Sequence, residues 1–256
     1  YVWSTGETTP AIVVTPASMT TYSVTVTVGT CSNATSVQIT VNPAPTASIT
    51  VDETSGLANN DGTICAGASA MLTASGGGTY LWSTGATTAV ITVTPAGSTT
   101  YTVTVTSVNG CTATASTTIT VNPLPAAAIS VAETSGTTND DGIICAGATV
   151  VLTASGGGTY AWSTGATTPA ISVTPGGTTT YTVTVTSISG CTATASTTIT
   201  VNPIPTAGIT VSETSGTTPN DGIICSGSTV TLTGTGGGTY AWSTGASSPF
   251  ITVSSG

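Results

Sequence analysis

The sequence contains no lysine, arginine or histidine, whereas it has nine aspartate and glutamate residues and a formal net charge of −9. A protein that binds nucleic acid needs a basic surface to neutralise phosphates, so this class of partner is excluded. Anionic membrane surfaces are excluded for the same reason. Without histidine or lysine, the many Ser and Thr hydroxyls lack a general base to activate them. We therefore expect no enzyme activity.

Long apolar runs are also missing. The longest runs are of strand length and are interrupted by Thr and Ser, whereas a membrane-spanning helix needs about 20 consecutive apolar residues. Because no side chain is cationic, the acidic side chains have no partner for a side-chain salt bridge, and their mutual repulsion favours an extended, soluble chain. The sequence predicts no membrane insertion by this segment.

An internal repeat of 80 residues organises what is present. The repeat is marked by one series of tryptophans and two series of cysteines: Trp82, Trp162 and Trp242; Cys65, Cys145 and Cys225; Cys31, Cys111 and Cys191. Trp3 precedes Trp82 by 79 residues, which places one deletion just before Cys31, in an expected hairpin turn, where length changes are tolerated. A period this long indicates a tandem array of small domains.

Pro-containing junctions set the frame of the repeat. The motifs NPAP, NPLP and NPIP begin at Asn42, Asn122 and Asn202, and two prolines two residues apart favour a semi-rigid, extended linker. The sequence predicts four units: 1–43, the C-terminal part of an Ig-like repeat; 46–123 and 126–203, two whole repeats; and 206–256, the N-terminal part of another. We expect this segment to belong to a longer array, with neighbouring repeats of the same chain as its first partners.

Strict alternation of apolar residues and threonine predicts β-strands. In TTYTVTVT, residues 99–106, Tyr101, Val103 and Val105 share one face, the period of a half-buried strand. TATASTTITV, residues 112–121, repeats the pattern, and Asn109-Gly110 between them suits a tight hairpin turn. Further strands are expected at residues 47–51, 68–75, 79–83 and 90–94. Roughly seven short strands per unit predict an all-β fold, a tandem series of Ig-like or PKD-like β-sandwiches arranged as an extended rod.

Each whole repeat contains two cysteines that are 46 residues apart. In an oxidising, extracellular setting we expect a disulfide within each repeat, Cys65 with Cys111 and Cys145 with Cys191. A loop of this size implies a stabilisation on the order of 4 kcal/mol, a useful amount in an 80-residue sandwich with a small core. A zinc site is disfavoured because the sequence has no histidine and no Cys-x-x-Cys motif.

The motif Tyr-x-Trp-Ser-x-Gly-x-Thr-Thr and the hairpin from Tyr-Thr-Val-Thr-Val-Thr to Gly-Cys-Thr-Ala-Thr carry a resemblance. The repeats resemble the Ig-like and PKD-like repeats of very large surface adhesins of Bacteroidota, most of all gliding-adhesin repeats of the SprB type. They depart from the PKD pattern at Ser163, Thr164 and Ala166, where that pattern has acidic residues. The resemblance implies a filament exported by the type IX secretion system and displayed on the cell surface.

Two conspicuous motifs have ordinary structural explanations. Trp82 and Trp162 are candidates for sugar-stacking platforms, but they share a strand face with Tyr80 and Tyr160, which favours packing in the core. The Gly76–Gly78 and Gly156–Gly158 runs are followed by no lysine, so a turn between strands is favoured over a phosphate-binding loop.

An acidic loop recurs once per repeat and is the candidate metal site. Its acidic members are Glu53 and Asp61; Glu133, Asp140 and Asp141; and Glu213 and Asp221. Crowded carboxylate oxygens are the ligands that Ca²⁺ prefers, although the spacing is not that of an EF-hand and Asp-Gly is also an ordinary turn sequence. Ca²⁺ is the only cofactor that the sequence suggests.

Two functions remain open. The favoured one is a structural stalk or shaft segment of a very large cell-surface adhesin filament, involved in surface adhesion or gliding motility. The alternative is an array in which each repeat recognises a surface glycan or the substratum and the copies gain avidity. Assignment of the tryptophans to the core favours the stalk.

Overall fold

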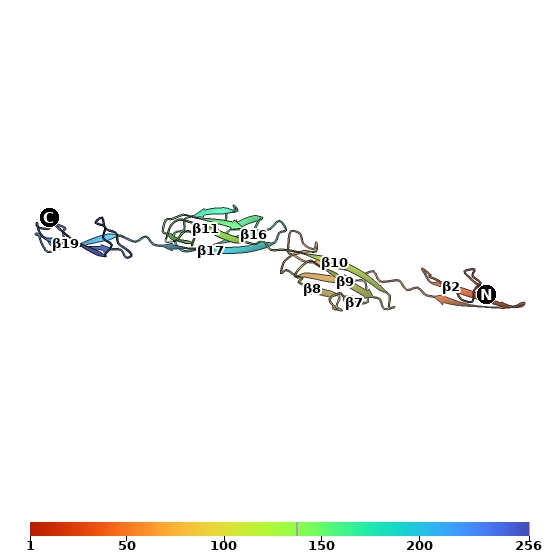
Figure 1. Ribbon diagram of the computed structural model, residues 1–256. Helices are drawn as coiled ribbons and strands as arrows, with labels where there is room; N and C mark the ends of the chain where they lie inside the picture. Colours follow the sequence, from red (N-terminus) through yellow and green to blue (C-terminus); the bar gives the residue numbers. More distant parts are fainter. Residues whose placement is uncertain (137, 256) are drawn as a thin grey trace. The chain divides into compact units, whose positions relative to one another are not determined.

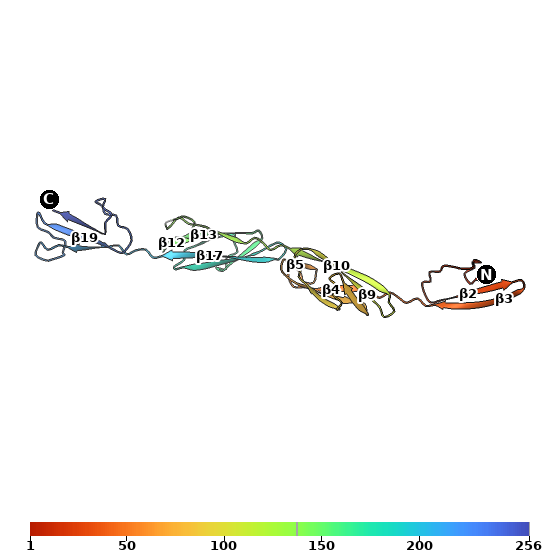
Figure 2. The same ribbon diagram turned by 60° about the horizontal axis from the view of Figure 1, so that its bottom comes forward.

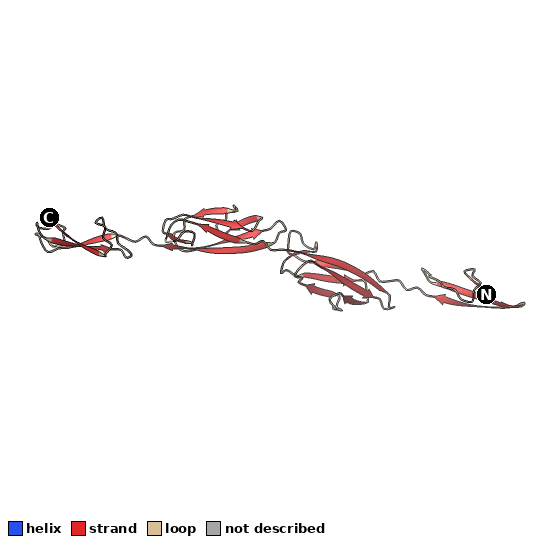
Figure 3. Ribbon diagram, in the orientation of Figure 1, coloured by secondary structure: helices blue, strands red, loops and turns tan. Residues whose placement is uncertain are grey.

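The computed structural model describes residues 1–136 and 138–255. Residues 137 and 256, which fall within the predicted units 126–203 and 206–256, lie outside the described residues. Every helix or strand among the described residues is a β-strand, as Figures 1 and 3 show. No described helix is long and apolar enough to span a membrane. Contacts divide the chain into two units, residues 1–125 with 186–192, and residues 126–185 with 193–256, which we describe separately.

The repeat 46–123 contains seven strands in two sheets. They are β4 (Ser48–Asp52), β5 (Thr63–Cys65), β6 (Ala70–Ser75), β7 (Thr79–Trp82), β8 (Val90–Val93), β9 (Thr99–Thr106) and β10 (Thr112–Asn122). One sheet has the order β4-β6-β8 and the other the order β5-β10-β9-β7. All pairs are antiparallel except β5 with β10, which is parallel and is visible in Figure 2.

The repeat 126–203 has the same seven strands and the same two sheet orders. They are β11 (Ala128–Ala132), β12 (Ile143–Cys145), β13 (Val150–Ser155), β14 (Thr159–Trp162), β15 (Ala170–Val173), β16 (Thr179–Thr186) and β17 (Thr192–Asn202). The sheets have the orders β11-β13-β15 and β12-β17-β16-β14. The predicted all-β, Ig-like sandwich is confirmed, as are the individually predicted strands to within about two residues.

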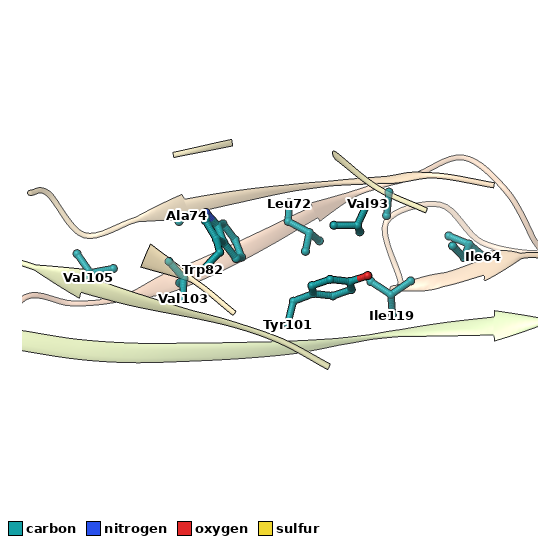
Figure 4. Packing of buried hydrophobic residues seen from close by; sticks show 10 residues of the cluster. Ile64, Leu72, Ala74, Trp82, Val93, Tyr101, Val103, Val105 and Ile119 are labelled. Carbon is teal, nitrogen blue, oxygen red and sulfur yellow. The ribbon is translucent and has the colours of Figure 1, made fainter. Parts of the chain in front are cut away.

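The core of each sandwich lies between its two sheets and follows the predicted alternation. Tyr101, Val103 and Val105 of β9 are buried, while the threonines between them are half-exposed. Figure 4 shows them facing Leu72, Ala74 and the other buried side chains of the cluster. Burial of each Val, Leu or Ile side chain contributes about 1.5–3 kcal/mol to folding.

The two outer segments each form a single sheet. Residues 1–43 contain β1 (Val2–Trp3), β2 (Thr20–Val28) and β3 (Cys31–Ile39), paired in the order β1-β2-β3. By the sequence repeat these strands correspond to β7, β9 and β10. Residues 206–255 contain β18 (Gly208–Ser212), β19 (Thr229–Thr235) and β20 (Phe250–Ser254), paired in that order, and they correspond to β4, β6 and β8. Each outer segment is therefore the counterpart of one layer of the sandwich.

Candidate functional site

The disulfide of this chain joins two successive repeats. Cys65 of the repeat 46–123 is bonded to Cys191 of the repeat 126–203, with a Cα–Cα distance of 5.5 Å and a sequence separation of 126 residues. Cys111 and Cys145, the partners predicted for these two cysteines, are free. The predicted pairing within each repeat is therefore wrong.

Strand register explains why a bond within the repeat cannot form. Parallel pairing of β5 with β10 places Cys65 beside Asn122, the last residue of an 11-residue strand. Cys111 precedes the first residue of that strand, so it lies roughly 36 Å away along β10. A disulfide needs Cα atoms within about 4.4–6.8 Å. The same register, Cys145 beside Asn202, separates Cys145 from Cys191 in the next repeat.

The hairpin turn between β16 and β17 supplies Cys191. The Ser187 amide donates to the Cys191 carbonyl at 2.8 Å, and the Gly190 amide donates to the Ser187 carbonyl at 3.0 Å. The Cys191 amide also donates to the Ser187 hydroxyl at 3.2 Å. These bonds hold residues 187–191, which we call the β16–β17 tip, and by its contacts the tip belongs to the unit of residues 1–125.

The β16–β17 tip fits closely against the loop that precedes β5. Gly190 has φ of 76°, and a Cβ atom placed on it would lie 2.8 Å from the Gly56 carbonyl carbon and 2.9 Å from the Leu57 nitrogen. Cys191 is fully buried, and its Sγ lies 4.0 Å from the carbonyl oxygen of Asn122, the register partner of Cys65. Only glycine at position 190 allows this approach without a steric clash.

The acidic loop positions β5 for this contact. In the repeat 46–123, the Glu53 amide donates to Asn60 Oδ1 at 3.0 Å, and the Asp61 amide donates to Glu53 Oε1 at 2.9 Å. The Thr63 amide, at the start of β5, donates to Asp61 Oδ1 at 2.7 Å. Asn60 has φ of 62°, a conformation that Asn and Asp tolerate better than other non-glycine residues. The loop is therefore a hydrogen-bonded brace that ends at the strand carrying Cys65.

The same brace recurs in the other two copies. The amides of Glu133 and Glu213 donate to Asp140 Oδ1 and Asn220 Oδ1, each at 3.1 Å. Since Asn60 and Asn220 occupy the position of Asp140, the bond needs an oxygen acceptor there but not a charge. The three glutamates Glu53, Glu133 and Glu213 are between 3% and 4% exposed.

The predicted Ca²⁺ ligands mostly use their oxygens within this brace. Asp141 and Asp221, like Asp61, accept the amide of the residue two positions later, at 2.8 Å. Glu133 Oε2 accepts the Ser135 amide at 3.0 Å. In residues 1–136 and 138–255, no three acidic, histidine or cysteine side chains converge to hold a metal ion. Calcium binding by the candidate residues stays a prediction.

The tryptophan of each intact repeat is a core residue, as predicted. Trp82 and Trp162 are 2% and 4% exposed. Their Nε1 atoms donate to the carbonyls of Thr88 and Thr168, each at 2.9 Å, so the polar edge of the ring is satisfied inside the fold. Gly85, within the same motif, has φ of 86° and donates its amide to the Trp82 carbonyl at 2.9 Å. The motif thus encodes a turn around a buried ring.

The glycine runs connect strands, also as predicted. Gly76, Gly77 and Gly78 all have positive φ, and they lie between β6 and β7. A Cβ atom on Gly76 would lie 2.7 Å from the Thr46 carbonyl oxygen, and one on Gly78 would clash with the Thr106 carbonyl. The run lets the chain turn tightly against neighbouring backbone.

No protein-family model and no curated protein matches this sequence. A solved structure of a 1.5-MDa bacterial ice-binding adhesin is similar with 21% identity and a TM-score of 0.31, over 77% of this chain and 78% of that one. A Ca²⁺-stabilised adhesin with which an Antarctic bacterium binds ice is similar with 21% identity and a TM-score of 0.35, over 86% of this chain and 66% of that one.

A third similar structure is SGBP-B from the mixed-linkage glucan utilization locus of Bacteroides ovatus, in complex with a mixed-linkage heptasaccharide. It has 14% identity and a TM-score of 0.20, over 76% of this chain and 65% of that one. At this level of similarity, the chain's function has to be argued from its own residues.

Proposed function

We propose that this chain is a tension-bearing structural segment, a stalk or filament shaft, of a large cell-surface adhesin, and that it is not an enzyme. The observation that carries the proposal is the bond between Cys65 and Cys191, which links consecutive repeats covalently. Such structural disulfides persist in oxidising surroundings, and this supports a location outside the cell. The neighbouring repeat is then the first partner of each repeat.

The position of the bond suits a segment that is pulled from both ends. Tension passes through the disulfide and bypasses the chain between the two cysteines, including the linker at Asn122–Pro125. A sequence separation of 126 residues corresponds to a contour length of roughly 430 Å that is withheld from extension. Bonds within each repeat would withhold 46 residues apiece and would leave the linker between repeats in the path of the force.

The finer assignment rests on the resemblance of the repeats to those of the gliding adhesin SprB. It supports surface adhesion or gliding motility as the process and type IX secretion as the route of export. The bond between repeats supports this assignment physically, because a moving surface filament is loaded along its length.

The glycan-binding alternative has less support. Recognition of sugars commonly uses an exposed aromatic ring, and each intact repeat has three aromatic residues. These are Tyr80, Trp82 and Tyr101, and Tyr160, Trp162 and Tyr181, and all six are buried or half-buried. No ring in these repeats lies open to stack on a sugar.

Force spectroscopy on the single chain, held at its two ends, tests the proposal. We expect the oxidised chain to reach a fully extended length that grows by roughly 430 Å when a reductant is added. Cys65→Ser should show the longer length without reductant, and Cys145→Ser, which removes a free thiol, should behave as the unsubstituted chain. An increase of roughly 310 Å, which two separate 46-residue loops would give, would contradict the proposed path of tension.

A further inference from the structure

We propose that two copies of this chain join end to end, with residues 206–255 of one copy and residues 1–43 of the other packing as the two sheets of one sandwich. Two disulfides then close across the junction, Cys145 to Cys31 of the second copy and Cys225 to Cys111 of the second copy. The proposal extends the observed pairing of Cys65 with Cys191 to the four cysteines that are free in the single chain.

The two outer segments are complementary layers. The sheet β18-β19-β20 corresponds to β4-β6-β8, which is one whole sheet of an intact repeat. The sheet β1-β2-β3 corresponds to β7, β9 and β10, which form the other sheet together with β5. In both intact repeats these layers pack face to face around the core. The molecule itself therefore shows what covers each open face.

Apolar side chains that are buried in the intact repeats are open in the outer segments. Val105 and Ile119 are fully buried, whereas their equivalents Val26 and Ile39 are each 38% exposed. Ile209, in the other outer segment, is 63% exposed. Removal of such side chains from water is the main source of stability in a sandwich, at about 25 cal/mol per Å² of apolar surface.

Both open faces are hollowed where the missing layer would lie. A depression of about 260 Å³ in the last segment is lined by Ile209, Tyr240 and Trp242, among others. A second depression, of about 180 Å³, lies in the first segment and is lined by Trp3, Tyr22 and Val24, among others. Exposed apolar hollows of this kind mark interaction surfaces.

The strands that the two segments have in common do not compete. Residues 240–242 and 1–3 both correspond to β7, but only Val2–Trp3 forms a strand, which pairs with β2. Phe250–Ser254 forms the strand equivalent to β8 and pairs with β19, whereas residues 11–14 form no strand. Each copy thus already supplies the strand that belongs to its own sheet.

The cysteines match under the observed rule. In the bond that the structure contains, the cysteine beside the acidic loop joins the hairpin cysteine of the next repeat. After repeat 126–203 comes the composite repeat, whose hairpin cysteine is Cys31 of the second copy, so Cys145 is its partner. The composite repeat supplies Cys225, and the next hairpin cysteine is Cys111 of the second copy.

Closing each bond needs a two-electron oxidant, and a small-molecule disulfide such as oxidised glutathione provides it by thiol–disulfide exchange. One thiolate attacks the disulfide and releases one glutathione thiol, and the second thiolate then displaces the other. Two protein thiols become one disulfide, and one oxidised glutathione becomes two thiols.

Incubation of the purified chain in a glutathione redox buffer at physiological salt tests the assembly. We expect a ladder of covalent oligomers on a non-reducing gel, with Cys31–Cys145 and Cys111–Cys225 peptides in the mass spectrum. A chain that stays monomeric, or oligomers bonded through like cysteines such as Cys31 with Cys31, would overturn the proposal. The Cys65–Cys191 peptide is read in the same spectrum, so failure of the assembly is distinguishable from failure of the proposed tension path.

Substitutions separate docking from bonding. The double variant Cys145→Ser, Cys225→Ser should lose the covalent ladder but still associate in sedimentation experiments; a surviving ladder would contradict the assigned pairs. Val26→Asp buries a charge in the junction and should weaken association by more than tenfold, on the order of what an unpaired buried charge costs. Thr27→Asp, which changes the exposed face of the same strand, is the matched control and should associate normally.

Discussion

The two hairpin tips of the intact repeats, residues 107–111 and 187–191, have nearly the same sequence and the same turn. The Ser107 and Ser187 amides each donate to the carbonyl of the tip cysteine at 2.8 Å, and Gly110 and Gly190 have φ of 80° and 76°. Their surroundings differ. Cys191 is fully buried and bonded, whereas Cys111 is half-buried and free.

The difference comes from what precedes each tip in the chain. A Cβ on Gly190 would clash with backbone at Gly56 and Leu57, whereas one on Gly110 would meet nothing within 4 Å. Cys111 Sγ lies 3.5 Å from the Asn42 carbonyl, as Cys191 Sγ lies near that of Asn122. Residues 1–43 contain no counterpart of Cys65, so the tip at 107–111 has its linker contact but no cysteine to bond. The local sequence makes the turn, and the preceding repeat makes the junction.

Removal of the tip cysteine should give the largest contrast between the two tips. Cys191→Ser opens a loop that spans 126 residues, for which the chain-entropy model gives a destabilisation of about 5 kcal/mol. Cys111→Ser removes a free thiol and should leave thermal unfolding unchanged. Calorimetry on the two variants checks this, and equal losses of stability would contradict the assigned pairing.

Alanine at the tip glycines isolates the close approach. Both substitutions place a Cβ at positive φ, which costs on the order of 1–2 kcal/mol in either tip. Gly190→Ala adds a backbone clash, so the equilibrium between the Cys65–Cys191 disulfide and its thiols in a glutathione buffer should shift about tenfold or more toward the thiols. Gly110→Ala should not shift it. The fraction of bonded chain, measured by thiol alkylation and mass spectrometry, decides between these outcomes.

The acidic brace gives the smallest contrast. Glu53→Ala and Glu133→Ala each leave buried backbone amides unpaired, at a cost of about 1–3 kcal/mol in the repeat concerned. Only Glu53 braces a loop next to a bonded cysteine. We expect similar losses of stability for the two variants, with a weaker Cys65–Cys191 bond for Glu53→Ala alone. Thiol alkylation of both variants measures the bond, and an equal effect would show that the brace does not position Cys65.

Much of the fold could be predicted because its signals are local and repeated. Alternation in β9 identified the buried face, and the shared strand face of Trp82 and Tyr80 favoured a core tryptophan. The glycine runs were predicted as turns because no lysine or helix follows them. These patterns need no knowledge of distant residues.

The disulfide could not be predicted from the same signals. Strand β5 has only three residues, and it pairs in parallel with β10, far along the chain, so no local alternation marks it. Without that register, Cys65 and Cys111 read as the two cysteines of one domain. The usable signal was the length of the last predicted strand: a cysteine that opens a ten-residue strand cannot reach one placed beside its other end.

A single proteolytic cut tests the central claim most directly. The chain has no Lys or Arg, so Ala126→Lys, at an exposed position between the repeats, creates one trypsin site. We predict that the two fragments stay together on a non-reducing gel and separate on a reducing one, because Cys65 and Cys191 lie on opposite sides of the cut. Thr46→Lys and Thr206→Lys, at the equivalent exposed positions, should release fragments without reductant. Separation of the Ala126→Lys fragments without reductant would contradict a covalent bond between the repeats.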